Sequence, residues 1–214
     1  MILEREGIII LAGGSGLRMG KIVKALVNLN NKPLITYVVD KALKVSTNIG
    51  VVIGKNYDQN MFRKVIPSFI PIWKDELEGK GPVVGLLTGM KKLEATYIAA
   101  LSCDIPFLNP EALKVLFKEI ERVHADSAIP LWPNGFKEPL HAVYKKTSFI
   151  SSAEDALRNN KLSLFEVITR LKRVVYIPVN QIKKVDLDLL TFFNVNTPKD
   201  LEEALAILKR LNSF

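Results

Sequence analysis

The stretch that decides the fold is IIILAGGSGLRMGKIVKAL, residues 8–26. Its apolar start, Ile8–Ala12, runs directly into the glycine-rich segment Gly13–Gly16, and the cations Arg18 and Lys24 follow. An apolar strand that ends in glycines and cations is a common arrangement for holding phosphate groups. The stretch therefore predicts a phosphate-binding loop at the end of a buried strand, and leaves open which phosphates are bound.

The size and composition of the chain fit one folded domain over residues 1–214. The chain is long enough to bury a full core, and 48% hydrophobic with 24% charged residues is ordinary for a globular protein. The formal net charge of +8 at pH 7 favours an anionic partner. Because the lysines and arginines are scattered and do not alternate with aromatic residues, a solvated basic surface is favoured over a nucleic-acid interface.

Cysteine, histidine and apolar content exclude several other kinds of protein. Cys103 is the only cysteine, so an internal disulfide is impossible, and with two histidines a zinc site of Cys and His ligands is not credible. The apolar residues Ile8–Ala12 are too few to span a membrane, and no cleavage site follows them. We expect a cytoplasmic protein with no membrane contact.

Apolar strands alternate with helical patterns along most of the chain. This alternation predicts an α/β fold of three layers, α/β/α, with a mostly parallel Rossmann-like sheet. The expected strands are 8–12, 49–53, 70–73, 97–102, 127–131, 139–144 and 174–178, and the expected helices are 34–43, 82–93, 110–123 and 198–211, with two further short helices in the C-terminal third.

Three polar features fall at the ends of expected strands. The glycine-rich segment follows Ala12, Asp75 follows the strand at 70–73, and Asp104 follows the strand at 97–102. Sheets of this kind bind ligands beyond the carboxyl ends of their strands. We therefore expect the active site at this edge of the sheet.

Two common phosphate-binding motifs do not fit the glycine-rich segment. The Walker pattern fails because Ser15 stands where its first glycine belongs and Ile22 where its magnesium-binding hydroxyl belongs. The dinucleotide fingerprint fails because Met19 replaces its third glycine. The acidic residue expected about 20 positions later is also missing, since Asp40 lies in a helical pattern. A nucleotide-binding oxidoreductase is therefore disfavoured.

A third pattern does fit: Leu-Ala-Gly-Gly-x-x-x-Arg-Met-Gly-x-x-x-Lys, from Leu11 to Lys24. Five further segments match the same family of proteins as this pattern. Each match is weak evidence alone, but six matching segments in the same order identify a family with high specificity. On these residues the chain resembles the molybdenum cofactor guanylyltransferases of the nucleotidyltransferase superfamily, over nearly its whole length. The five further segments are NKPLITYVVDKAL (31–43), WKDELEGKGPVVGLLTGM (73–90), SCDIPFL (102–108), EPLHAVY (138–144) and FFNVNTPKDL (192–201).

The resemblance implies a reaction and its substrates. GMP would pass from GTP to molybdopterin carrying its metal, with release of pyrophosphate and formation of a guanine dinucleotide cofactor. Mg²⁺ is the implied cofactor, and transient contact with other cofactor-biosynthesis proteins is implied as well. Close alternatives keep the chemistry and change a substrate, with CTP in place of GTP or a phosphorylated corrinoid, sugar or polyol as acceptor.

The resemblance also assigns catalytic roles. Arg18 can hold the leaving phosphates with paired donors, and Lys24 supplies a point charge near the α-phosphate. Asp104 would be the magnesium ligand, with Asn196 as an assistant or only as a residue that satisfies the turn before the last helix. Val23 stands where the family usually has an aspartate that could orient Lys24.

Asp75 is the residue expected to select the base. One carboxylate can accept both the N1–H and the 2-amino group of guanine, a donor pair that adenine and cytosine lack; the alternative is an ordinary surface acid. The full set that the resemblance assigns to GTP is Leu11, Ala12, Gly13, Gly14, Ser15, Gly16, Lys24, Asn56, Asp75 and Asp104.

We expect the cysteine and the two histidines to have structural roles and no catalytic role. Cys103 fits a buried small residue better than a nucleophile. His141 fits a packing or hydrogen-bonding residue better than a catalyst, and His124 fits a favourable charge near a helix end.

Overall fold

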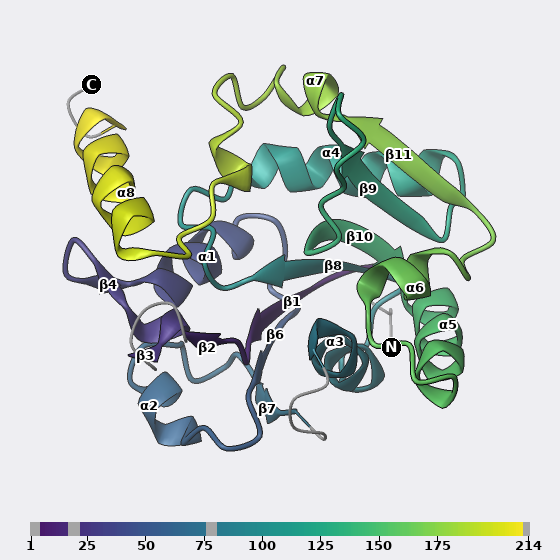
Figure 1. Ribbon diagram of the computed structural model, residues 1–214, viewed down its shortest axis with the longest axis horizontal. Helices are drawn as coiled ribbons and strands as arrows, with labels where there is room; N and C mark the ends of the chain where they lie inside the picture. Colours follow the sequence, from purple (N-terminus) through teal and green to yellow (C-terminus); the bar gives the residue numbers. More distant parts are fainter. Residues whose placement is uncertain (1–4, 17–21, 76–80, 212–214) are drawn as a thin grey trace.

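A seven-stranded sheet crosses the centre of the molecule in the computed structural model, which describes residues 5–16, 22–75 and 81–211 (Figure 1). The strand order is β11-β9-β10-β8-β1-β6-β7, and β10 alone among these strands runs antiparallel to its neighbours. The predicted α/β fold with a mostly parallel sheet is confirmed. The strands are β1 (Glu6–Ala12), β6 (Ile49–Ile53), β7 (Ile72–Lys74), β8 (Tyr97–Ser102), β9 (Ser127–Leu131), β10 (His141–Lys145) and β11 (Val174–Pro178).

Strand β1 is buried on both faces because it is apolar at every central position. Ile8 and Ile10 enter the core on one side of the sheet, and Ile9 enters the core on the other. Helices cover both faces of a parallel sheet, so a central strand has no solvated face. Its sequence is therefore apolar throughout and does not alternate between polar and apolar residues. The decisive stretch of sequence thus forms the middle of the sheet, between β6 and β8.

Helices cover both faces of the sheet, which confirms the three-layer arrangement (Figure 1). A last helix, α8 (Pro198–Leu211), packs instead over the small hairpin of β4 and β5, where Leu29, Val195 and Ala204 share a separate core. One face carries α1 (Leu34–Ala42), α2 (Gln59–Arg63), α4 (Pro110–Arg122) and α7 (Val179–Ile182), and the other carries α3 (Gly81–Lys92), α5 (Lys146–Arg158) and α6 (Leu164–Ile168).

Helix α3 packs against the sheet through two glycines that face it. A Cβ on Gly89 would lie 2.8 Å from Cδ1 of Ile9 on β1. One turn earlier, a Cβ on Gly85 would lie 3.4 Å from Cδ2 of Leu11 and 3.3 Å from Oδ2 of Asp75. The glycines therefore allow the helix to approach β1 and the residue that follows β7.

Two short hairpins and two 3₁₀ helices were not predicted. The hairpins are β2 (Ser15–Gly16) with β3 (Ile22–Val23), and β4 (Asn28–Leu29) with β5 (Lys32–Pro33), and the 3₁₀ helices are η2 (Lys24–Leu26) and η3 (Leu190–Phe192). The second hairpin turns through Asn30 and Asn31, which have φ angles of 49° and 63°. Asparagine tolerates this left-handed conformation, so both residues suit the turn.

Two predictions about the C-terminal half were wrong in detail. The extended segment at 139–144 begins later, because Pro139 and Leu140 form a turn closed by the bond from the His141 N–H to the Glu138 carbonyl at 3.1 Å. The first helix after it is not short, since α5 runs for 13 residues. Among the described residues, no helix is both long and apolar enough to cross a bilayer.

Candidate active site

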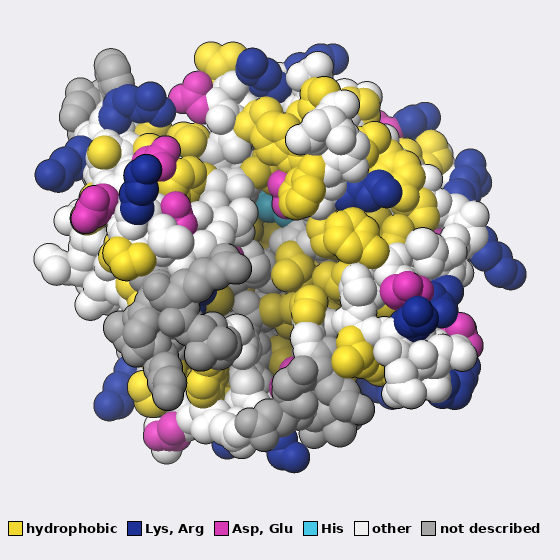
Figure 2. Space-filling view, in the orientation of Figure 1, with side chains coloured by type: hydrophobic (Ala, Val, Ile, Leu, Met, Phe, Trp, Pro, Cys, Tyr) yellow, Lys and Arg dark blue, Asp and Glu magenta, His cyan; other side chains and the backbone are white. Residues whose placement is uncertain are grey.

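A cleft of about 710 Å³ opens at the carboxyl edge of the sheet, where the sequence predicts the site. In Figure 2 it is the hollow in the middle of the face shown, with hydrophobic side chains gathered along the wall over β9, β10 and α6. The cleft is lined by Leu11, Gly13, Gly14, Lys24, Val52, Ile53, Gly54, Lys55, Asn56, Tyr57, Asp75, Gly81, Pro82, Gly85, Ser102, Cys103, Asp104 and Leu140.

The glycine loop at the end of β1 is packed tightly against the end of β6. A Cβ on Gly13 would lie 3.2 Å from the backbone nitrogen of Gly54, so a larger residue would push the two segments apart. The hydroxyl of Tyr57 donates a hydrogen bond to the carbonyl of Gly14 at 3.2 Å. Backbone contact and this tether fix the first part of the loop.

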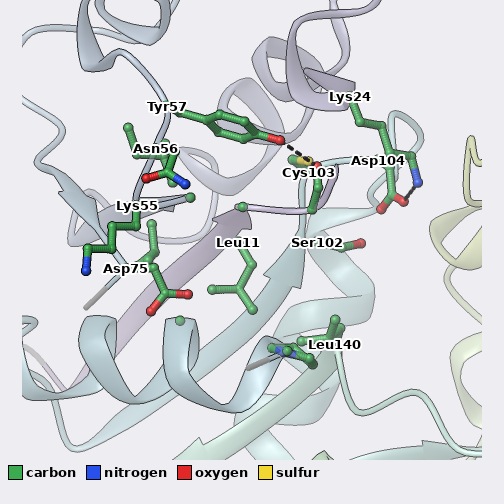
Figure 3. Close-up of a pocket in the computed structure, with 18 residues that line it drawn as sticks. Leu11, Lys24, Lys55, Asn56, Tyr57, Asp75, Ser102, Cys103, Asp104 and Leu140 are labelled. Carbon is green, nitrogen blue, oxygen red and sulfur yellow. Dashed lines mark hydrogen bonds and ion pairs between the residues drawn. The ribbon is translucent and has the colours of Figure 1, made fainter. Parts of the chain in front are cut away.

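Lys24 and Asp104 meet at one end of the cleft (Figure 3), and Asn196 contacts Lys24 there from outside the cleft lining. The Lys24 ammonium pairs with Oδ2 of Asp104 and donates a hydrogen bond to Oδ1 of Asn196 at 2.7 Å. The Lys24 and Asp104 side chains are only 14% and 11% exposed, so the ion pair is largely shielded from water. A cation and a carboxylate are thus held where a charged substrate can reach both.

Three segments far apart in the chain position this cluster. Asp104 follows β8, where the Cys103 N–H donates to the Leu11 carbonyl at 3.1 Å. The Val195 N–H donates to the Asp104 carbonyl at 2.9 Å, which draws the segment before α8 to the site. Asp200 then accepts from the Asn196 N–H at 2.8 Å as part of the cap of α8. Asn196 therefore satisfies the turn before the helix and contacts the site as well.

The Asp104 carboxylate has one oxygen available to a metal ion. Its Oδ1 is buried and has no hydrogen-bond partner within 5–16, 22–75 and 81–211, whereas Oδ2 pairs with Lys24. The same part of the chain holds no cluster of three or more His, Cys, Asp or Glu side chains arranged for a metal. Mg²⁺ commonly binds through one or two carboxylates together with substrate phosphates and water. The residues present fit a cation that arrives with a nucleotide.

Asp75 lies at the opposite end of the cleft from Lys24 and Asp104, with Leu11 between them (Figure 3). The residue follows β7, and its N–H donates to the Ile53 carbonyl at 2.8 Å. Its carboxylate lies close to Gly85 of α3, where a Cβ would sit 3.3 Å from Oδ2 of Asp75. One carboxylate at each end gives the cleft two chemically distinct regions.

Most of the residues assigned to GTP line this one cleft. Ala12 is buried behind the loop, and the backbones of Ser15 and Gly16 form β2. Arg18 lies outside the described residues. The residues that meet in the lining are Leu11, Gly13, Gly14, Lys24, Asn56, Asp75 and Asp104.

Sequence reasoning missed Lys55 and Tyr57, which line the cleft beside Asn56. Both follow the predicted strand at 49–53, so the rule that ligands bind beyond the carboxyl ends of strands would have found them.

The two other reactive side chains near the cleft are buried and structural. Burial raises the pKa of the Cys103 thiol, which keeps it protonated and supports the prediction that it is no nucleophile. His141 is 3% exposed, and burial lowers its pKa to about 3. Its Nε2 lies 3.2 Å from the Thr191 hydroxyl, and its ring packs against Phe192. The predicted packing role of His141 is confirmed.

Comparison with known proteins agrees with the geometry. A family model described as the MobA-like NTP transferase domain matches residues 8–174. A probable molybdenum cofactor guanylyltransferase of Methanosarcina mazei is 32% identical over 205 residues, which are 94% of this chain and 90% of that one. The crystal structure of molybdopterin-guanine dinucleotide biosynthesis protein A from Archaeoglobus fulgidus superposes with a TM-score of 0.81 at 30% identity, covering 95% of this chain and 99% of that one.

A more distant neighbour shares the fold alone. The 2-C-methyl-D-erythritol 4-phosphate cytidylyltransferase of Thermus thermophilus gives a TM-score of 0.67 at 14% identity, covering 96% of this chain and 99% of that one. The extent of the family match and the identity to the first relatives are decisive, and the chain belongs to the MobA-like NTP transferase family.

Proposed function

We propose that the protein is a magnesium-dependent molybdenum cofactor guanylyltransferase, which transfers GMP from GTP to molybdopterin. Its family membership and the names of its relatives support this function. The observation that carries the proposal is that one cleft has Asp75 at one end and the Lys24–Asp104 pair at the other. This arrangement suits a nucleoside triphosphate whose base and phosphates need different partners.

Asp75 suits the base end of the substrate. Guanine offers the N1–H and the 2-amino group side by side, and the two oxygens of a carboxylate can accept both. Gly85 leaves space between the Asp75 carboxylate and Leu11, and Leu11 gives the base an apolar surface to lie on. We expect this carboxylate to favour GTP over ATP and CTP.

Lys24 and Asp104 suit the reacting phosphates. An oxygen of the acceptor's phosphate forms a bond to the α-phosphorus of GTP while the bond from the α-phosphorus to the bridging oxygen breaks, and pyrophosphate leaves. Such reactions depend on positioning and on neutralising charge more than on a protein nucleophile. The Lys24 ammonium offsets charge on the α-phosphate, and Asp104 with its available Oδ1 would hold Mg²⁺. When bound, the ion supplies further positive charge to the triphosphate.

Binding and turnover on matched variants test the proposal. GTP with Mg²⁺ should raise the melting temperature more than CTP, ATP or UTP, since a ligand at 100 times its Kd adds about 2.7 kcal/mol of stability. Asp104→Ala should lower the rate of pyrophosphate release by about a thousandfold, because several kcal/mol of charge stabilisation is lost. Asp40→Asn, which breaks the exposed ion pair with Lys32, is the control and should change neither result.

Two outcomes would contradict the proposal. A larger thermal shift with CTP than with GTP would favour the cytidylyl alternative. An Asp104→Ala variant that keeps its turnover and its magnesium dependence would remove Asp104 from the metal site.

A further inference from the structure

Glu138 is a half-buried carboxylate whose charge is not matched by a protein cation. It forms no ion pair within the described part of the chain, although the protein has 30 lysines and arginines. Its neighbour Lys137 lies over the ring of Tyr176 instead, with Nζ 5.1 Å from the ring centroid. Burial raises the pKa of the Glu138 carboxyl, and the hydrogen bond from Trp132 opposes that rise. A carboxylate in this setting is suited to the N–H donors of a ligand.

One aromatic ring contacts this carboxylate directly, and two further rings pack in a row behind it. The indole Nε1 of Trp132 donates to Oε1 of Glu138 at 2.8 Å, which fixes the side chain and leaves lone pairs on both oxygens. Trp132 meets Phe192 edge to face with centroids 5.6 Å apart, and Phe192 meets His141 in the same way at 4.8 Å. Figure 2 shows the hydrophobic wall of the hollow on this side of the molecule. The surroundings suit a flat heteroaromatic ring.

Sheet order places Glu138 and Asp75 on opposite sides of Asp104. Asp75 follows β7, Asp104 follows β8, and Glu138 precedes β10, while the order in the sheet is β10-β8-β1-β6-β7. Leu140, two residues after Glu138, lines the cleft. His141 pairs with Leu101, which lies three residues, or about 10 Å of extended chain, before Asp104. A molecule anchored at Glu138 can therefore extend toward Asp104 from the side away from Asp75.

We propose that Glu138 anchors the pterin ring of the acceptor, with its carboxylate accepting from the N3–H and the 2-amino group. This inference rests on the proposed function, because it takes the acceptor to be a pterin phosphate. Guanine and pterin present the same adjacent donors on a 2-amino-4-oxo pyrimidine edge. The cleft, together with the adjoining wall at Glu138 beyond Leu140, would then hold the two ends of the dinucleotide product with one carboxylate each, Asp75 for guanine and Glu138 for pterin, with the reacting phosphates between them.

The experiment compares pterin with lumazine, whose 2-oxo group replaces the 2-amino donor, by fluorescence titration of the wild-type protein and of Glu138→Gln. The glutamine keeps the shape and the acceptor for Trp132 but presents an amide N–H₂ to the ligand. The wild-type protein should bind pterin about tenfold or more tightly than lumazine, and the variant should lose this preference. GTP affinity and melting temperature should stay unchanged in Glu138→Gln.

Trp132→Phe is the matched control, because it removes the indole donor to Glu138 and keeps the carboxylate and an aromatic ring. It should retain the preference for pterin. If Glu138 acts only by holding Trp132, Glu138→Gln will keep the pterin preference, and the inference is overturned. Failure of the wild-type protein to bind pterin also overturns it, and the GTP titration on the same samples shows separately whether the proposed function stands.

Discussion

Lys24 is held between Asp104 and Asn196, so its ammonium group is in place before any substrate binds. An ammonium at this point matters most when charge develops on the α-phosphate, because an interaction that strengthens in the transition state raises kcat. We expect Lys24→Ala to lower kcat for pyrophosphate release by about a hundredfold or more and to raise KM for GTP less. A raised KM with an unchanged kcat would show that Lys24 only binds the ground state of the substrate. The absence of the family's aspartate at Val23, which would orient Lys24, would explain that result.

Gly85 controls the space beside the Asp75 carboxylate, to which the proposed function assigns the base. A methyl group there would sit 3.3 Å from Oδ2 of Asp75 and 3.4 Å from Cδ2 of Leu11, which is tight but does not force the backbone to move. Gly85→Ala should therefore weaken GTP binding about tenfold while lowering stability by less than about 1 kcal/mol. Calorimetric titration with GTP and urea unfolding measure the two effects. Unchanged GTP affinity would show that the base does not approach Gly85.

Single residues of the site were predictable where a strand rule applied to them. Asp75 and Asp104 follow apolar strands, so their position at one edge follows from a parallel sheet. The ion pair of Lys24 with Asp104 and the contact with Asn196 were not predictable, because they join residues 80 and 172 positions apart. No local pattern encodes a contact of that kind, since it exists only once the whole sheet has formed.

Helix α3 packs tightly against the sheet at its glycines. At Gly89 a methyl group would lie 2.8 Å from Cδ1 of Ile9 and 3.0 Å from its Cγ2, so the helix must shift away from β1. We expect Gly89→Ala to lower the free energy of unfolding by about 1–3 kcal/mol, as overpacking does. The double variant Ile9→Val with Gly89→Ala removes the nearest methyl group. Its free energy of unfolding should fall by less than the sum of the decreases in the two single variants. Additive losses in urea unfolding would place the strain elsewhere.

The two α3 glycines are controls for one another. Gly89→Ala should lower the free energy of unfolding and leave GTP affinity unchanged. Gly85→Ala, one helical turn away, should weaken GTP binding and change stability little.

Elements with a long apolar or amphipathic pattern were predicted well. The strands β6, β8, β9 and β11 and the helix α8 begin and end where the sequence places them. The two-residue hairpins were missed because two residues carry no periodicity, and the turn of the second hairpin depends on the φ angles of Asn30 and Asn31. The late start of β10 follows from the turn at Pro139 and Leu140, where an apolar residue adds to the cleft instead of the sheet.

The stability of the whole molecule should depend on pH through His141. Burial lowers its pKa to about 3, so the native state stays unprotonated where the unfolded state binds a proton. Below about pH 6.5 proton binding by this histidine therefore stabilises the unfolded state. The free energy of unfolding falls by about 1.4 kcal/mol for each pH unit, which amounts to about 2 kcal/mol at pH 5. The loss levels off once the native residue also binds a proton, near pH 3.

Urea unfolding at about pH 7 and about pH 5 measures this dependence in the wild-type protein and in His141→Gln. The variant should be less stable at neutral pH but should lose about 2 kcal/mol less between the two conditions. Equal losses in both proteins would show that His141 is protonated in the native state.

The contact of Lys24 with Asp104 and Asn196 has a consequence for synthesis on the ribosome. Asn196 is made 92 residues after Asp104. At about 5–20 residues per second this interval lasts about 5–18 s. During that time the nascent chain contains the lysine and the aspartate, but the asparagine that completes the cluster does not yet exist. The Lys24–Asp104 end of the cleft is therefore completed late in translation, and a ribosome that stalls within this interval carries a chain without the full cluster.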